Sequence, residues 1–361
     1  MIEPEPSQGE PRPSASSSGE KPKAHRLGRD AGKPESWLFA WTCCASIWFS
    51  VFILAVLLIA VTKNAIGWLD WQFLTSFDSA RLPARSGMLS GILGTAWVIL
   101  FTILFSVPVG VGAAIYLEEY ASDNWINRLI RLNLSNLAGV PSIVYGILGL
   151  TVFVRMFGLF GPQGWIHQWT GWTLEGFFWS DHYRQYLIPL PFGRVVISGA
   201  LTLSLLILPI IIIASQEALR AIPPSLRHAS LALGATKWQT IRYQILPAAV
   251  PGIMTGIILA ISRAIGETAP LVMLGAMTFV YFAPGNIDSV SDIVAHPEGL
   301  IKAPFDTFTV MPIQIFNWVR QSKEEFKHVA SAGIVVLLAV LLLLNGLAIL
   351  IRNRYSKHLR W

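Results

Sequence analysis

Charged side chains and cysteines are both scarce in this sequence. Only 13% of the 361 residues are charged, and there are two cysteines. These two, Cys43 and Cys44, are adjacent inside an apolar run, which suits neither a disulfide framework nor a zinc site with spaced ligands. In contrast, 53% of the residues are hydrophobic and the mean hydropathy is +0.54. This composition disfavours soluble globular and disordered proteins and predicts a membrane protein.

Motifs for catalysis and nucleotide binding are also missing. The seven histidines are scattered, and the sequence contains no Gly-x-Ser-x-Gly, His-Glu-x-x-His or Gly-x-x-x-x-Gly-Lys-Ser/Thr run. We therefore predict no catalytic residue, no metal and no bound cofactor, and we assign any nucleotide chemistry to another chain. The net charge of +6 is spread over several short segments. This distribution argues against binding to nucleic acid.

Six apolar stretches are long enough to cross a hydrocarbon core, which needs about 20 residues in a helix. In lipid the backbone must satisfy its own hydrogen bonds, so each stretch is expected to be a helix. The sequence thus predicts an all-α polytopic membrane protein with six transmembrane helices. The expected spans are residues 37–61, 88–117, 134–159, 195–214, 248–276 and 329–351.

The segments outside the spans predict the domain organisation and the orientation. Residues 1–36 are rich in Pro, Ser and Lys and are expected to form a disordered cytoplasmic tail, followed by the first helix and an outer loop over 37–87. Residues 353–361 are expected to form a second tail. The two tails with the second and fourth loops hold sixteen Lys and Arg, against nine in the other loops, which places both termini in the cytoplasm. Tryptophans of the third loop are expected to anchor the opposite interface, namely Trp165, Trp169, Trp172 and Trp179.

The fourth loop, residues 215–247, has the start and stop signals of two short helices. Pro223 and Pro224 end the preceding helix, and Ser225 is expected to cap a new one. Gly234 ends this helix, and a Thr-x-x-Gln capping box starts a second helix at Lys237. The first helix would carry a stripe of small and apolar residues, Leu226, Ala229, Ser230 and Leu233. Such an elbow is either an amphipathic loop lying on the membrane or a docking surface for a cytoplasmic partner.

The fifth span contains two charged residues, Arg263 and Glu267. A charge near the bilayer centre costs about 2.5 to 3.5 kcal/mol, so it is kept there with a partner or a polar cavity. The spacing of four places both side chains on one helical face, where they can pair. Gly266 and Pro270 weaken the helix, and an opened turn beside Thr268 could present amides and a hydroxyl to an anion. The alternative is a purely structural ion pair. Glu118 and Glu119, after the second span, are expected to form a solvated helix end.

The fourth loop resembles the Glu-Ala-Ala, Gly, Leu-Pro loop of ABC importer permeases. In that family the elbow is the coupling helix, which fits into a cleft of the ATP-binding subunit. The resemblance implies that ATPase coupling involves His228, Ala229, Ser230, Gly234, Ala235, Leu246 and Pro247. The sequence departs from the pattern with His228 for the usual Glu, Ser230 for the second Ala and Gln244 for Ile.

Residues 266–270, Gly-Glu-Thr-Ala-Pro, resemble the A-type permease subunit of phosphate-specific ABC importers, and further fragments between residues 94 and 355 agree. The resemblance implies a type I permease fold over 88–352 with a coupling loop at 216–247. It implies substrate translocation at Arg263, Gly266, Glu267 and Thr268.

The same resemblance implies the surroundings of the chain. Its partners would be a PstC-like permease, a cytoplasmic ATPase dimer that uses the ATP, and an extracytoplasmic phosphate-binding protein, in a bacterial plasma membrane. The substrate would be inorganic phosphate. The alternatives are a permease for another oxyanion, such as phosphonate or sulfate, and a membrane signalling subunit that does not transport.

Overall fold

The computed structural model describes residues 34–155, 192–277, 280–287 and 298–357, and these divide into two compact units at Leu57 and Leu58. The described residues form α-helices with short 3-10 and π-helical turns, and none of them lies in a strand. Within these residues, five helices are long and apolar enough to cross a membrane, or six if one bent pair counts as a span. The predicted all-α polytopic fold is therefore confirmed. The tryptophans predicted to anchor the third loop lie outside the described residues.

The first unit contains the start of helix α1, Pro34–Ala65. The helix begins inside the segment predicted as tail, at a proline, which suits the first turn of a helix. Its hydroxyl groups bond to carbonyls of the preceding turn, as from Ser46 Oγ to Thr42 O over 2.8 Å and from Ser50 Oγ to Ser46 O over 2.9 Å. These bonds satisfy the polar groups within the helix, as a lipid environment requires.

The second unit is built around α8, Val196–Arg220. Two thirds of the most apolar 18-residue stretch of α8 is buried, and the helix packs along α3, Leu89–Ile115. Small polar residues join the two helices. Thr102 Oγ1 donates to Ala200 O over 3.3 Å, and Ser204 Oγ donates to Thr102 O over 3.3 Å. Hydrogen bonds of this kind are a common way for membrane helices to associate.

Besides the start of α1, further predicted boundaries differ from the structure. The expected third span, 134–159, is two elements, α4 (Trp125–Ala138) and α5 (Ser142–Gly149), and α5 continues in a π-turn, Leu150–Val154. The pair is bent by 105° because Pro141 has no amide hydrogen to donate and disfavours a helical conformation in the residue before it. α8 runs to Arg220, six residues past the predicted end. α16, Glu325–Lys357, includes residues 353–357 of the predicted tail.

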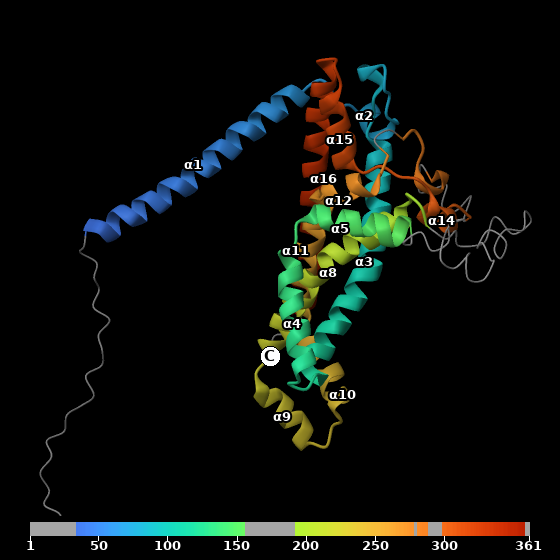
Figure 1. Ribbon diagram of the computed structural model, residues 1–361. Coiled ribbons are helices and arrows are strands. Elements are labelled where there is room, and N and C mark those ends of the chain that lie inside the picture. The colour runs from blue at the N-terminus through green and yellow to red at the C-terminus, as the bar shows by residue number, and fades with distance from the viewer. Residues whose placement is uncertain (1–33, 156–191, 278–279, 288–297, 358–361) are drawn as a thin grey trace, which may run out of the picture. The chain divides into compact units, whose positions relative to one another are not determined.

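The remaining elements are short, except for the helix that enters the membrane after the elbow. α10 (Lys237–Thr240), a π-turn (Ile241–Ile245) and α11 (Leu246–Gly266) are continuous and form one span. Within the second unit, α9 and α10 lie at one end and α2 at the other, with α5 and α12 between them (Figure 1). The other elements are α2 (Trp71–Thr75), η1 (Pro83–Arg85), η2 (Tyr116–Tyr120), α9 (Pro224–Ala232), α12 (Ala269–Leu274), η6 (Pro284–Asn286), α14 (Glu298–Lys302), η7 (Ala303–Phe305) and α15 (Met311–Arg320).

Candidate functional site

The helix breaks where the sequence predicted that it would weaken. α11 ends at Gly266, and Glu267 follows in an extended conformation with φ −81° and ψ 110°. α12 then begins at Ala269, with Pro270 in its first turn. The expected span 248–276 is therefore two helices joined at Glu267 and Thr268. A break at this place leaves amide and carbonyl groups of the backbone without the hydrogen-bond partners that a continuous helix would give them.

Arg263 and Glu267 form the predicted ion pair. Arg263 Nε lies 3.3 Å from Glu267 Oε1, across one turn at the end of α11. The arginine side chain is 48% exposed and the glutamate side chain 20%. One face of the guanidinium is thus held by the carboxylate while much of it stays accessible. Gly266 and Thr268 flank the glutamate, so the four residues predicted to act in translocation lie together in this chain segment.

Close packing from neighbouring helices holds this break in place. A Cβ on Gly146 of α5 would lie 2.7 Å from Pro270 Cα and 2.8 Å from Pro270 O. Only glycine permits α5 and α12 to approach so closely. On the other side, Ser262 Oγ donates a hydrogen bond to Asn345 Oδ1 of α16. The residue before Arg263 is therefore fixed by a polar contact between two membrane helices.

An open apolar groove of about 600 Å³ borders the break at Thr268. Its walls come from α5, α12 and α15. The lining residues are Ile143, Thr268, Ala269, Val272, Met273, Pro312, Ile315, Phe316 and Val319. Thr268 is the polar member of this set, so the groove offers a hydrophobic surface with few groups that could form hydrogen bonds.

The elbow between α8 and α11 has the predicted turn. Gly234 has a φ of +86°, the left-handed conformation that favours glycine after a helix. Thr236 Oγ1 accepts a hydrogen bond from the Gln239 amide over 3.3 Å, and Gln239 Oε1 accepts one from the Thr236 amide over 2.8 Å. This capping box starts α10 at Lys237, as predicted.

One prediction for the elbow is wrong. Pro223 is the N-cap of α9 and Pro224 its first residue, so Ser225 does not cap the helix. Within the predicted stripe, Ala229 is exposed and Leu233 is 89% exposed, whereas Leu226 and Ser230 are half-buried. The second helix continues past Pro247, because proline is tolerated in the first turn of α11.

The residues assigned to coupling lie in different environments. His228, Ala229 and Gly234 are exposed, and Ser230 and Ala235 are half-buried. Ser230 Oγ is hydrogen bonded to Thr240 Oγ1 at 2.9 Å, which ties α9 to α10. The departure from alanine at this position thus has a structural role. Leu246 and Pro247 are half-buried at the start of α11 and lie away from the exposed tip.

The prediction that Glu118 and Glu119 form a solvated helix end is wrong. Glu118 accepts two hydrogen bonds from Arg220 Nε, each 3.0 Å long, and Glu119 lies 2.8 Å from Arg227 Nη2. The glutamate side chains are 16% and 8% exposed. The sequence does not show these ion pairs, because the acidic and basic partners are about a hundred positions apart. The available signal was two adjacent acids directly after an apolar run.

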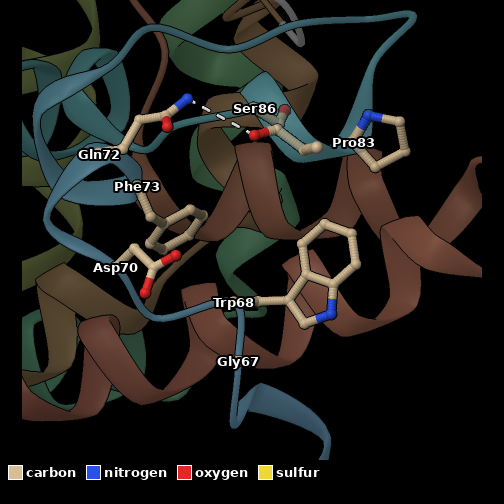
Figure 2. A pocket seen from close by; sticks show the side chains of 8 residues that line it. Gly67, Trp68, Asp70, Gln72, Phe73, Pro83 and Ser86 are labelled. Carbon is tan, nitrogen blue, oxygen red and sulfur yellow. Dashed lines mark hydrogen bonds between the residues drawn. The ribbon is translucent and has the colours of Figure 1, made fainter.

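A second hollow lies at the other end of the unit, beside α2 and η1, with a volume of about 190 Å³. Figure 2 shows the side chains of Trp68, Asp70, Gln72 and Ser86 around it. Gln72 Nε2 donates a long hydrogen bond, 3.5 Å, to Ala84 O across the hollow. Among the residues that the structure describes, no three His, Cys, Asp or Glu side chains lie where they could hold a metal ion.

Comparison with known proteins identifies the family. Residues 106–360 match the sequence pattern described as "Binding-protein-dependent transport system inner membrane component". The matched region includes the elbow, the broken helix and both glutamates after α3.

Several curated proteins are similar to the chain. The probable ABC transporter permease protein YqgI of Bacillus subtilis is 32% identical over 65% of this chain and 68% of its own length. The phosphate transport system permease protein PstA of Yersinia pestis is 28% identical over 84% of this chain and 85% of its own length. PstA 1 of Mycobacterium tuberculosis is 32% identical, over 67% and 63% respectively.

Solved structures agree with the fold. A chain from a bacterial ABC transporter for the import of alginate superposes with a TM-score of 0.54 at 17% identity, covering 89% of this chain and 96% of that chain. This match concerns the fold alone. The matched family pattern shows that the chain belongs to the inner membrane components of binding-protein-dependent transport systems, the multi-pass permease subunits of ABC importers.

Proposed function

We propose that this permease carries inorganic phosphate across the plasma membrane, together with a second, PstC-like permease. The observation that carries the proposal is the Arg263–Glu267 pair at the break between α11 and α12. A planar guanidinium donates parallel hydrogen bonds that match phosphate. A half-exposed arginine at membrane depth is costly unless it meets a charged partner or a polar pathway. The similarity to phosphate transport permeases supports the same substrate.

In this proposal each residue of the break has its own part. Arg263 attracts the anion. Glu267 holds one side of the guanidinium, which positions it and keeps phosphate from binding too tightly to leave. Gly266 allows the chain to open, and the Thr268 hydroxyl and nearby amides offer further hydrogen bonds to oxygen atoms of the substrate.

The energy for transport is proposed to enter at the elbow. A separate ATPase dimer in the cytoplasm would bind the exposed tip around His228, Ala229 and Gly234 and use the ATP. Both termini would then lie in the cytoplasm, in agreement with the distribution of Lys and Arg. A phosphate-binding protein would deliver the substrate from the other side, and the chain itself would hold no cofactor.

The test is uptake of labelled phosphate at low external concentration, in cells that express the whole transporter. Arg263→Gln is expected to abolish uptake and Glu267→Gln to reduce it strongly, with the complex still assembled. Arg128→Gln is the matched control, because that arginine is exposed and pairs weakly with Asp123 at 3.9 Å.

Three outcomes would contradict the proposal. Normal uptake in both Arg263→Gln and Glu267→Gln would remove the translocation role. Uptake of labelled sulfate or phosphonate that needs the chain, without uptake of labelled phosphate that needs it, would assign another oxyanion. A phosphate-responsive transcript that needs the chain while uptake does not would favour the signalling role.

A further inference from the structure

One π-helical turn at the end of α3, η2 (Tyr116–Tyr120), contacts four other elements. The Arg131 guanidinium of α4 donates to Leu117 O and lies 3.5 Å from Glu118. Glu118 also meets Arg220 at the end of α8. Lys237 at the start of α10 lies over the Tyr120 ring, with Nζ 5.1 Å from its centre. The remaining contact is Glu119 with Arg227 of α9. Turns of this type recur at functional sites.

Glu119 and Arg227 form the most enclosed of these contacts. Both Nε and Nη2 of Arg227 donate to Glu119 Oε1, at 3.1 and 2.8 Å. The same guanidinium also donates to the carbonyls of Ile222 at 3.0 Å and Leu219 at 2.9 Å. One side chain of the elbow therefore ties α9 to the end of α3 and also to Leu219 in the last turn of α8 and Ile222 just after that helix.

α9 has few other contacts with the described membrane helices, apart from its packing on the π-turn Ile241–Ile245. No residue of α9 is fully buried. Leu226 packs partly on the core between α3 and α8, and Ser230 bonds only to Thr240 within the elbow itself. The Arg227–Glu119 contact is therefore the direct charged link from α9 to the end of α3, beside the contact of Lys237 with Tyr120.

We infer that Glu119 and Arg227 are positioning residues through which movement of the elbow is transmitted to α3 and α8. The inference rests on the proposed function, in that an ATPase is taken to move the elbow. Because Glu119 is nearly enclosed and charged, it stays with its partner rather than exchanging with solvent. The two helices then follow α9 as one body.

The first experiment measures how much phosphate is transported per ATP hydrolysed. It uses the whole transporter in proteoliposomes, with the phosphate-binding protein present. Glu119→Gln keeps the size of the side chain but removes its charge, and it is expected to lower the ratio by about fivefold or more. The double exchange of Glu119→Arg with Arg227→Glu is expected to restore at least part of it.

Glu217→Gln is the matched control, because Glu217 is an exposed acid on the last turn of α8 and contacts Arg220 rather than Arg227. Its ratio is expected to equal that of the wild type. An unchanged ratio in an assembled Glu119→Gln complex would overturn the inference. If that complex does not assemble, Arg227→Lys keeps the charge but loses the additional donors to Leu219 and Ile222, and an unchanged ratio there would overturn the inference.

A second readout needs no substrate and so separates this inference from the substrate assignment. Spin labels at Leu104 of α3 and Leu259 of α11, both exposed, report the distance between the helices with and without bound nucleotide. Cys43 and Cys44 are first replaced by serine. Nucleotide should change the distance in the wild type and not in Glu119→Gln. An equal change in both, or none in the wild type, would overturn the inference. Failure of the wild type to transport phosphate would overturn only the proposed substrate.

Discussion

Trp318 Nε1 donates a hydrogen bond to Asp78 Oδ1 over 2.9 Å and joins residues that are 240 positions apart. Ser86 Oγ donates to the same oxygen over 2.5 Å, and Asp78 is only 7% exposed. The contact fastens the connection between α2 and α3 to α15, and Ser86 also lines the hollow in Figure 2. A buried carboxylate with neutral partners has consequences for stability and for its dependence on pH.

The Asp78 contact predicts a difference between two substitutions. Asp78→Leu leaves the Trp318 and Ser86 donors without their acceptor and is expected to destabilise the protein by about 1 to 3 kcal/mol. Asp78→Asn keeps one acceptor oxygen and is expected to cost less than about 1 kcal/mol. The free energy of unfolding in detergent micelles checks both. Equal losses in the two variants would show that the acceptor oxygen is unimportant.

The same residue predicts a pH dependence. Burial raises the pKa of Asp78 above its ordinary value of 3.8, despite the hydrogen bonds that lower it. Between 3.8 and the raised pKa the folded protein holds a proton that the unfolded chain has released. The free energy of unfolding therefore falls as the pH rises through this window, and the loss is complete above the raised pKa. Unfolding midpoints over a pH series should show this fall in the wild type and a smaller one in Asp78→Asn. Parallel curves would contradict it.

The close contact between α5 and α12 predicts that any side chain at Gly146 destabilises the protein. Gly146→Ala would place a methyl group within 2.8 Å of Pro270 backbone atoms, so backbone must shift, at a cost of about 1 to 3 kcal/mol. Gly112→Ala is the control, because nothing lies within 4 Å of the added group. There we expect a change between zero and about 1 kcal/mol of stabilisation, since alanine favours a helix. Thermal unfolding compares the two, and equal behaviour would refute the close contact.

The left-handed conformation of Gly234 predicts that substitution there loosens the elbow. Gly234→Ala meets open space but must adopt a φ of +86°, at a cost of about 1 to 2 kcal/mol. Faster amide hydrogen exchange is expected in residues 229–240 and not elsewhere. Gly234→Asn should be milder, because asparagine tolerates the left-handed conformation. Gly346→Ala, in α16, is the control substitution. Unchanged exchange in Gly234→Ala would contradict the strained turn.

Ser262 and Asn345 predict a measurable coupling between α11 and α16. In a double-mutant cycle of Ser262→Ala and Asn345→Leu, we expect an interaction energy of about 0.6 kcal/mol, and at most about 1.7. Unfolding in lipid bicelles gives the four stabilities required. Additive effects of the two substitutions would show that the hydrogen bond contributes nothing to the association of the helices.

Local patterns in the sequence were sufficient for several features. The Arg263–Glu267 pair depends only on a spacing of four, and the break beside it depends on Gly266 and Pro270. The capping box at Thr236 and the turn at Gly234 are likewise encoded within a few residues. Each prediction was confirmed because the partners are neighbours along the chain. The proposed roles of these residues in transport and coupling stay predictions.

Features that depend on distant partners were missed. Glu119 and Arg227 are 108 positions apart. The sequence around either residue does not show whether its charge is paired and buried or lies at a solvated helix end. A proline inside an apolar run predicts a kink at Pro141, but the sequence does not indicate a bend as large as 105°, because hydropathy continues across the break. Ser225 has a good capping side chain, but the two prolines before it set the start of α9.

The span from Lys237 to Gly266 has a mechanical consequence. Its 30 residues form a continuous rod about 45 Å long that starts at the elbow and ends beside the ion pair. Tilting such a rod by about 10° around its middle displaces each end by about 4 Å, in opposite directions. Arg263 is near the far end. The elbow and the arginine thus lie near opposite ends of one helix, so a tilt that moved the elbow would move the arginine in the opposite direction.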